Sequence, residues 1–407
     1  MHSKTYYSIS KYKIFLTLIF FQYVSFGLNS LDTQLWILIF GIINFKSLIT
    51  TGKNKVYFSI ILFLPIFVQY IAFLYTFDFD LFSFIRGLTS FLIFVIIFNY
   101  QSNNFQLFIK NYKYFIVLNI IFILIGFIQL VTNPNIFNFL LTPRTSISRG
   151  VTSLTPEPTA FGIMLVFLIL IELLFLNIVN RKFTIFIIIL NIITILFIAK
   201  SATATLYLIL SLFIWALISY KFKFKYFIYF LFILLFLIYI NQNLYLIFGD
   251  TRIFKILNNI NTNDLIKIIL NDTSVFDRIM ATIFGFKASL NNFFIPGGFY
   301  LEKTLNPINI VLFETYITNY HPGSKLMSLW GSLIASYGFI SFIFIFFIFH
   351  KIFRNINKIS LLYRKRIIFI TIMIFFLGFT SITISYSFLG FIISIIFTFI
   401  ESQKIKL

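Results

Sequence analysis

Long apolar runs separated by short polar stretches follow one another along almost the whole chain. Each is about long enough for a helix that crosses the roughly 30 Å hydrocarbon core of a bilayer. The predicted spans are residues 14–30, 32–46, 56–76, 81–99, 113–132, 158–178, 183–199, 203–219, 226–248, 327–349, 366–383 and 386–401. The pattern therefore predicts an all-α protein, a polytopic integral membrane bundle of about 12 transmembrane helices.

Composition supports the bilayer as the solvent of this chain. Hydrophobic residues make up 60% and charged residues 11%, against roughly 45–50% and about 25% in soluble domains. The first run follows Lys4, Lys11 and Lys13 but lacks a small-residue cleavage site. It is therefore expected to be a retained span and not a removed signal peptide.

The net charge of +20 is explained by topology and not by nucleic acid. The basic residues are dispersed between apolar runs, so no nucleic-acid partner is expected. Loops on the N-terminal side of the membrane hold 21 Lys and Arg residues and one acid, Glu401, whereas the opposite loops hold ten basic and ten acidic residues. The positive-inside rule then predicts that both termini are cytoplasmic.

Two outer segments are too long to be simple turns, residues 133–157 and residues 249–326. Long loops are uncommon unless they have a function. The expected organisation is an N-terminal membrane part (1–248), a large outer loop with amphipathic helices (249–326) and C-terminal spans (327–407). Any chemistry is expected in the two outer segments.

The first outer segment ends with Arg149 and Glu157, just before the predicted span that begins at Pro158. Proline suits the first helical position, and a carboxylate is favoured at the positive end of a helix, so Glu157 can be explained as part of a helix start. It can also be explained chemically. Arginine binds phosphate in a bidentate manner, and a nearby carboxylate can act as a base.

The run from Arg149-Gly150 through Glu157-Pro158 to Gly162 resembles the signature of the O-antigen polymerases, the Wzy-type enzymes. The related O-antigen ligases share their general layout. Those families have about twelve spans, cytoplasmic termini and a large outer loop late in the chain. The resemblance covers the whole chain in architecture and about fourteen residues in motif.

The large outer loop contains a predicted amphipathic helix. Ser274 and Asp277 form a capping box, apolar residues follow at helical spacing, and the helix is expected to end at 291–292, before Pro296. Arg278 lies in its first turn, where the family carries a comparable arginine. Either Arg278 anchors the helix at the membrane surface or it binds diphosphate.

Two further residues are candidates. His321, before the tenth span, is either a solvated side chain or a base, and Pro322 at the next position departs from the pattern of the ligases. Arg86 lies within the fourth span, near Asp78 and Asp80. It either snorkels to the outer surface or binds pyrophosphate, because charges inside a membrane are costly.

Two other features have less specific explanations. The hydroxyl-rich run 200–205 resembles a turn of the family, but a tight hairpin between helices accounts for it. Glu172 lies about 21 Å into the sixth span at 1.5 Å per residue, with no basic partner predicted at that depth. A protonated, buried carboxyl is the only account of it that the sequence offers.

The resemblance implies a polymerase that joins oligosaccharide units linked to undecaprenyl diphosphate at the outer face of the bacterial inner membrane. Arg149, Arg278 and Arg86 would hold the departing diphosphate, and Glu157 or His321 would be the base. Membrane lipid is an expected partner and a chain-length regulator protein a candidate one. With no Cys and three scattered His residues, no metal or cofactor is expected. The alternatives are an O-antigen ligase and a lipid-linked-sugar flippase or secondary transporter, although no internal repeat supports a transporter.

Overall fold

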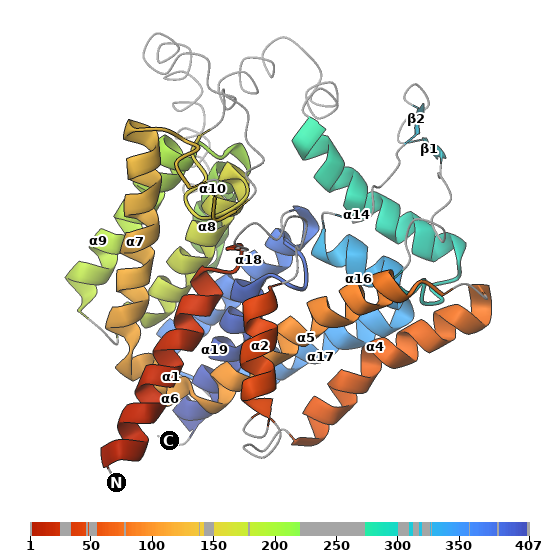
Figure 1. The fold of residues 1–407 in the computed structure, drawn as a ribbon, viewed down its shortest axis with the longest axis horizontal. Helices are drawn as coiled ribbons and strands as arrows, with labels where there is room; N and C mark the ends of the chain where they lie inside the picture. The colour runs from red at the N-terminus through yellow and green to blue at the C-terminus, as the bar shows by residue number, and fades with distance from the viewer. Residues whose placement is uncertain are drawn as a thin grey trace.

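The fold was obtained as a computed structural model. It describes residues 2–24, 34–45, 48, 55–76, 79–137, 139–141, 150–177, 180–219, 273–299, 309–311, 317–319, 326, 328–357, 359–380 and 382–404. These residues are almost entirely helical (Figure 1). The helices are α1 (His2–Phe20), α2 (Leu35–Ile43), α4 (Lys55–Thr76), α5 (Leu81–Asn103), α6 (Phe105–Lys110), α7 (Tyr112–Val131), α8 (Pro158–Phe175), α9 (Arg181–Ile193), the π-helix η1 (Thr194–Ala199), α10 (Ala202–Ser219), α14 (Thr273–Asn291), α16 (Leu329–Tyr337), α17 (Phe339–Ile356), α18 (Leu361–Thr380) and α19 (Ser387–Lys404).

One small sheet accompanies the helices. Strands β1 (Asn309–Val311) and β2 (Ile317–Asn319) pair antiparallel, with Asn309 opposite Asn319. Both strands belong to the segment 249–326, which was predicted to be a large outer loop. The described part of the chain is thus an all-α bundle with one short hairpin.

Several predicted spans coincide with observed helices to within a few residues. These helices are α4, α5, α7, α8, α9 with η1, α10 and α19. Within the described ranges, six helices are long and apolar enough to cross a membrane: α5, α7, α8, the continuous α9–η1 helix, α10 and α17. The chain is therefore a helical, multi-span membrane protein. The predicted span at 226–248 lies outside the described residues.

Three predicted spans were wrong in their boundaries. The first helix covers His2–Phe20 and gives way to a turn at residues 21–23, whereas the prediction placed a span at 14–30. The predicted span 32–46 contains a helix of only 9 residues, α2. The span 327–349 is two helices, because Gly338 interrupts it with a φ of +55° and a ψ of −135°. Hydropathy measures the length of an apolar run and does not detect such a break.

Helix α8 is the most buried of the six candidate spans. Apart from Glu172 its sequence is apolar on nearly all sides, as expected for a helix surrounded by protein. It packs against α9, η1 and α10 and also contacts α18 and α19. In Figure 1, α7, α8, α9 and α10 lie to the left, α4, α5, α16 and α17 lie to the right, and α18 and α19 lie between them.

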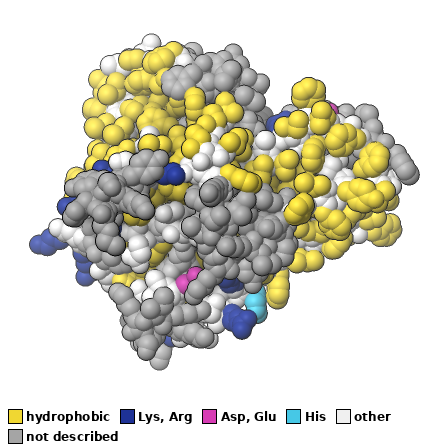
Figure 2. Space-filling view, turned by 60° about the horizontal axis from the view of Figure 1, so that its bottom comes forward, with side chains coloured by type: hydrophobic (Ala, Val, Ile, Leu, Met, Phe, Trp, Pro, Cys, Tyr) yellow, Lys and Arg dark blue, Asp and Glu magenta, His cyan; other side chains and the backbone are white. Residues whose placement is uncertain are grey.

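The surface carries large apolar side chains that a soluble protein would bury. Phe63, Phe82, Phe186 and Phe346 are each more than half exposed. Figure 2 shows broad hydrophobic surfaces on two parts of the molecule, with many of the visible Lys and Arg side chains along the left and lower edges of that view. Exposed apolar area on this scale is what a lipid-facing surface requires.

Candidate functional site

A non-helical segment, Gly150–Glu157, enters the bundle between α7 and α8. Its residues 151–155 are all buried, and the amide of Val151 donates to the carbonyl of Ile198 in η1 at 3.2 Å. Gly150 lies so close to η1 that a Cβ atom there would be 2.1 Å from the carbonyl oxygen of Ala199. Glycine is required at this position because only a residue without a side chain can approach that backbone.

Gln129 of α7 holds the middle of this segment. Its Oε1 accepts from the amide of Ser153 at 2.6 Å, and its Nε2 donates to the carbonyl of Ser153 at 3.1 Å. The Ser153 hydroxyl donates to the carbonyl of Phe122 at 2.7 Å. Phe122 precedes the last residue of α7 by nine positions, so the segment descends about 14 Å along that helix.

Ser153 has a φ of +51°, a conformation that costs a non-glycine residue about 1–2 kcal/mol. The bonds to Gln129 and Phe122 maintain it. Within a membrane, non-helical backbone is tolerated only where protein surrounds it or where it lines a water-filled cavity. The neighbouring η1 is a π-helix, a rare feature that is frequent at functional sites. We therefore treat this segment as the candidate functional site.

Glu157 stands at the junction of the segment and α8. It has extended dihedral angles (φ −142°, ψ 149°), Pro158 is the first helical residue, and the Glu157 side chain makes no capping hydrogen bond. The predicted helix start is confirmed. The carboxylate is half-buried and makes no capping hydrogen bond, so of the two effects expected at a helix start only the favourable charge at the positive end of α8 applies to it.

The hydroxyl-rich run 200–205 packs against the same region. It forms a tight turn from η1 into α10, as expected for a helical hairpin, with Lys200 at a φ of +46° and the Ser201 hydroxyl accepting from the amide of Ala204 at 3.3 Å. A Cβ atom at Gly162 would lie 2.6 Å from that of Ala204. Two runs that the sequence analysis treated separately are thus neighbours.

Arg86 lies apart from this site. It is half-buried on α5, which packs mainly against α2, α4 and α19, whereas α8 packs mainly against α9, α10 and η1. Asp80 caps α5 by accepting from the amides of Phe82 and Ser83 at 3.3 and 3.1 Å. The structure therefore does not place Arg86 beside Glu157.

Of the other predicted site residues, Arg149 and His321 lie outside the described residues. Arg278 is the sixth residue of α14, whose predicted existence and end at Asn291 are confirmed. The side chain of Arg278 is outside the described part. Within the described ranges, no three His, Cys, Asp or Glu side chains form a group that could hold a metal ion.

Helix α14 lies against α16 and α18. Gly285 and Gly331 meet at its crossing with α16, where a Cβ atom on Gly285 would lie 2.3 Å from the carbonyl oxygen of Gly331. The Ser289 hydroxyl donates to the carbonyl of Ile334 at 2.7 Å. Small residues at such a crossing let two helices approach closely.

A second non-helical segment, residues 292–299, follows α14. The amides of Gly297 and Gly298 donate to the carbonyls of Ala335 and Ser336 at the end of α16, at 3.2 and 3.0 Å. The Phe299 amide donates to Oε1 of Gln69 in α4 at 3.1 Å, and its ring covers Gly87 beside Arg86. The described part of the chain thus places Arg86 near this segment.

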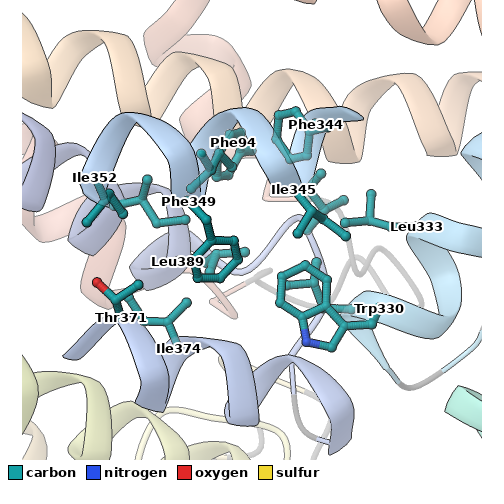
Figure 3. Close-up of a pocket in the computed structure, with 14 residues that line it drawn as sticks. Phe94, Trp330, Leu333, Phe344, Ile345, Phe349, Ile352, Thr371, Ile374 and Leu389 are labelled. Atoms are coloured by element: carbon teal, nitrogen blue, oxygen red, sulfur yellow. The ribbon is translucent and has the colours of Figure 1, made fainter. Parts of the chain in front are cut away.

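Two spaces among the described residues are apolar. One cavity of about 30 Å³ lies between α5, α16, α17, α18 and α19 and is walled by side chains such as Phe94, Trp330 and Phe349 (Figure 3). It is large enough to hold a water molecule, but its walls offer too few polar partners to retain one. The other is an open groove of about 750 Å³ beside α14, lined by apolar side chains together with Thr282 and Lys287.

No protein-family model, curated protein or solved structure matches this chain. Sequence reasoning identified Glu157, but it missed Gln129, Ser153 and η1. An uncharged polar residue inside an apolar run, such as Gln129, was the available signal. It identifies a buried hydrogen-bonding position without identifying the partner.

Proposed function

We propose that this protein polymerises oligosaccharide units carried on undecaprenyl diphosphate, at the outer face of the bacterial inner membrane. The proposal includes the topology of about twelve spans with cytoplasmic termini and two functional outer segments. A hydroxyl of one lipid-linked unit would attack the anomeric carbon of the growing glycan. The bond from that carbon to the diphosphate oxygen would break, and the hydroxyl proton would pass to a base.

The observation that carries the proposal is the buried, non-helical segment 150–157, with Arg149 preceding it and Glu157 at its end. Arg149 is assigned to the leaving diphosphate, because a guanidinium group is a bidentate phosphate ligand. Glu157 is assigned as the base, because its half-buried carboxylate lies where the segment meets α8. Arg278, Arg86 and His321 are assigned as further diphosphate-binding or basic groups.

The groove beside α14 is compatible with a lipid-linked substrate. It is open and almost entirely apolar, with Lys287 among its lining residues. An isoprenoid chain requires an apolar surface, and the attached diphosphate requires a cation. The segment that carries Arg278 would thereby lie beside the lipid.

Deletion of the gene in the parent bacterium tests this function. We expect surface glycan to remain as single repeat units on its anchor, because units are still made and exported but not joined. Complete loss of single-unit material would contradict the proposal and favour a flippase. Full-length glycan that accumulates on the lipid carrier without transfer would favour a ligase.

A pair of substitutions tests the assigned site. Arg149→Lys should lower polymerisation about 10²–10³-fold, because lysine keeps the charge but cannot reproduce the bidentate contact. Arg144→Lys, five residues earlier and outside the motif, is the matched control and should have little effect. Equal, mild effects of both substitutions at equal protein levels in the membrane would contradict the role of Arg149.

A further inference from the structure

Glu172 of α8 is fully buried, and the helices on either side supply amides to its carboxylate. Asn119 of α7 donates from Nδ2 to Oε1 at 2.9 Å. Asn191 of α9 donates from Nδ2 to Oε1 and Oε2 at 3.3 and 3.1 Å. All three side chains have no exposed surface.

This carboxyl group lacks a basic counterpart within the described part of the chain. The groups that act on it there are the two amides and the nearby phenol of Tyr112. An isolated ionised carboxylate is expensive to bury, and the amide bonds supply no net charge to balance it. Glu172 must therefore bind a proton or a cation.

Two buried oxygen atoms beside the carboxylate are unsatisfied. Oδ1 of Asn119 and Oδ1 of Asn191 have no hydrogen-bond partner, although the Nδ2 atom of each amide bonds to Glu172. Buried polar atoms without partners are rare, and each requires an explanation. Here both belong to the side chains that contact one uncompensated acid.

We propose that Glu172, Asn119 and Asn191 form a binding site for a monovalent metal cation, Na⁺. A proton on Glu172 would neutralise the charge but could satisfy at most one of the unpartnered oxygens. A cation can contact the carboxylate and both amide oxygens together, because each amide oxygen lies next to the nitrogen that already bonds to Glu172.

The type of ligand identifies the type of ion. Carboxylate and amide carbonyl oxygens are ligands of hard cations. A single carboxylate balances a single positive charge, whereas tight divalent sites usually combine several carboxylates. Na⁺ is about as large as Ca²⁺, which binds oxygen at about 2.3–2.6 Å, and such distances let one ion bridge oxygens of neighbouring helices.

The site is separate from the segment 150–157. Glu172 lies fourteen positions after Pro158, which is about 21 Å along the helix. A cation there would join α7, α8 and α9, and the inference does not depend on the proposed polymerase activity. The experiment below measures stability and ion binding, so its outcome is independent of the glycan phenotype.

The test compares thermal unfolding of the purified, detergent-solubilised full chain in NaCl, KCl and choline chloride at constant ionic strength. We expect NaCl to raise the Tm of the wild type by several degrees, more than KCl, because a ligand that binds only the folded state stabilises it. Glu172→Gln should abolish the difference. Glu401→Gln, which changes an exposed carboxylate on α19, should retain it.

Equilibrium binding of ²²Na⁺ to the wild-type protein covers the case in which Glu172→Gln does not fold. We expect about one ion per chain, with weaker binding to Asn191→Ala. Equal Tm values in the three salts would overturn the site, as would a Tm that responds to pH but not to Na⁺. Unchanged ²²Na⁺ binding by a folded Glu172→Gln variant would also overturn it.

Discussion

Segments 150–157 and 292–299 both interrupt a helical membrane bundle, but different groups stabilise them. The first is held at its centre by the side chain of Gln129 and by its own Ser153 hydroxyl. The second is held largely by backbone bonds to Ala335 and Ser336, with one side-chain bond from Gln69. Irregular backbone within a membrane needs hydrogen-bond partners in either case.

The difference determines how each segment can vary. Carbonyl groups at the end of a helix can accept hydrogen bonds whatever its sequence. They therefore hold any segment whose backbone amides come close enough, and they select for its shape more than for its residues. A glutamine side chain specifies one donor and one acceptor at one depth. We infer that segment 150–157 is the more strictly defined of the two, as a candidate site for chemistry should be.

The largest expected loss of stability comes from replacing the glycine that lies against the backbone at each segment. Gly338→Ala would place a Cβ atom 2.2 Å from the carbonyl of Phe294, at a φ of +55°, and Gly150→Ala would place one 2.1 Å from that of Ala199. Each should destabilise the protein by roughly 3 kcal/mol or more, since backbone must move. Unfolding in detergent and the yield of monodisperse protein are the measurements.

Gly126→Ala on α7 is the control for this pair. Its Cβ atom would meet the ring of Phe161 at 3.0 Å, and a ring edge can shift more easily than a carbonyl. It should cost much less than the other two. If Gly150→Ala is as mild as Gly126→Ala, segment 150–157 is more adaptable than its hydrogen bonds indicate.

An intermediate loss of stability is expected when a glutamine that holds either segment is replaced, and it should be larger for the segment that depends on its side-chain bonds. Gln129→Met removes both bonds to the Ser153 backbone and should cost about 1–3 kcal/mol, because the Ser153 N–H stays buried without a partner. The Ser153 carbonyl keeps only the bond from the Thr152 hydroxyl at 3.3 Å. Gln69→Met removes the single bond to Phe299 and should cost about 0.6 kcal/mol, a typical value between membrane helices. Chemical unfolding of both variants under one condition gives the comparison, and equal losses would contradict it.

The smallest effect concerns the left-handed conformation of Ser153. Ser153→Ala and Ser153→Gly both lose the bond to Phe122. Glycine also relieves the strain of the left-handed conformation, about 1–2 kcal/mol. The greater conformational entropy of glycine in the unfolded chain offsets only part of this gain. Ser153→Gly should therefore be the more stable variant. At Ser289 within α14 the order should reverse by about 1 kcal/mol, since glycine is a poor helix former. The same order at both positions in unfolding experiments would contradict the conformation of Ser153.

Much of the bundle could be predicted from the sequence because hydropathy is a property of consecutive residues. Helices α5, α7 and α8 begin within one residue of their predicted starts, and Pro158 marks the start of α8. The amphipathic helix α14 was identified from its capping box and spacing. Gly338 could not be identified as a break, because glycine is also common inside unbroken membrane helices.

The sequence by itself determined that this chain is a membrane protein, because only a lipid bilayer can bury its apolar runs. It also determined where several helices begin and that Glu157 follows an irregular segment. Only the tertiary structure decided that Gln129 bonds to Ser153 and that Asn119 and Asn191 meet Glu172. These pairs join residues 19 to 53 positions apart, and their partners depend on how the helices pack, which no local pattern of residues records.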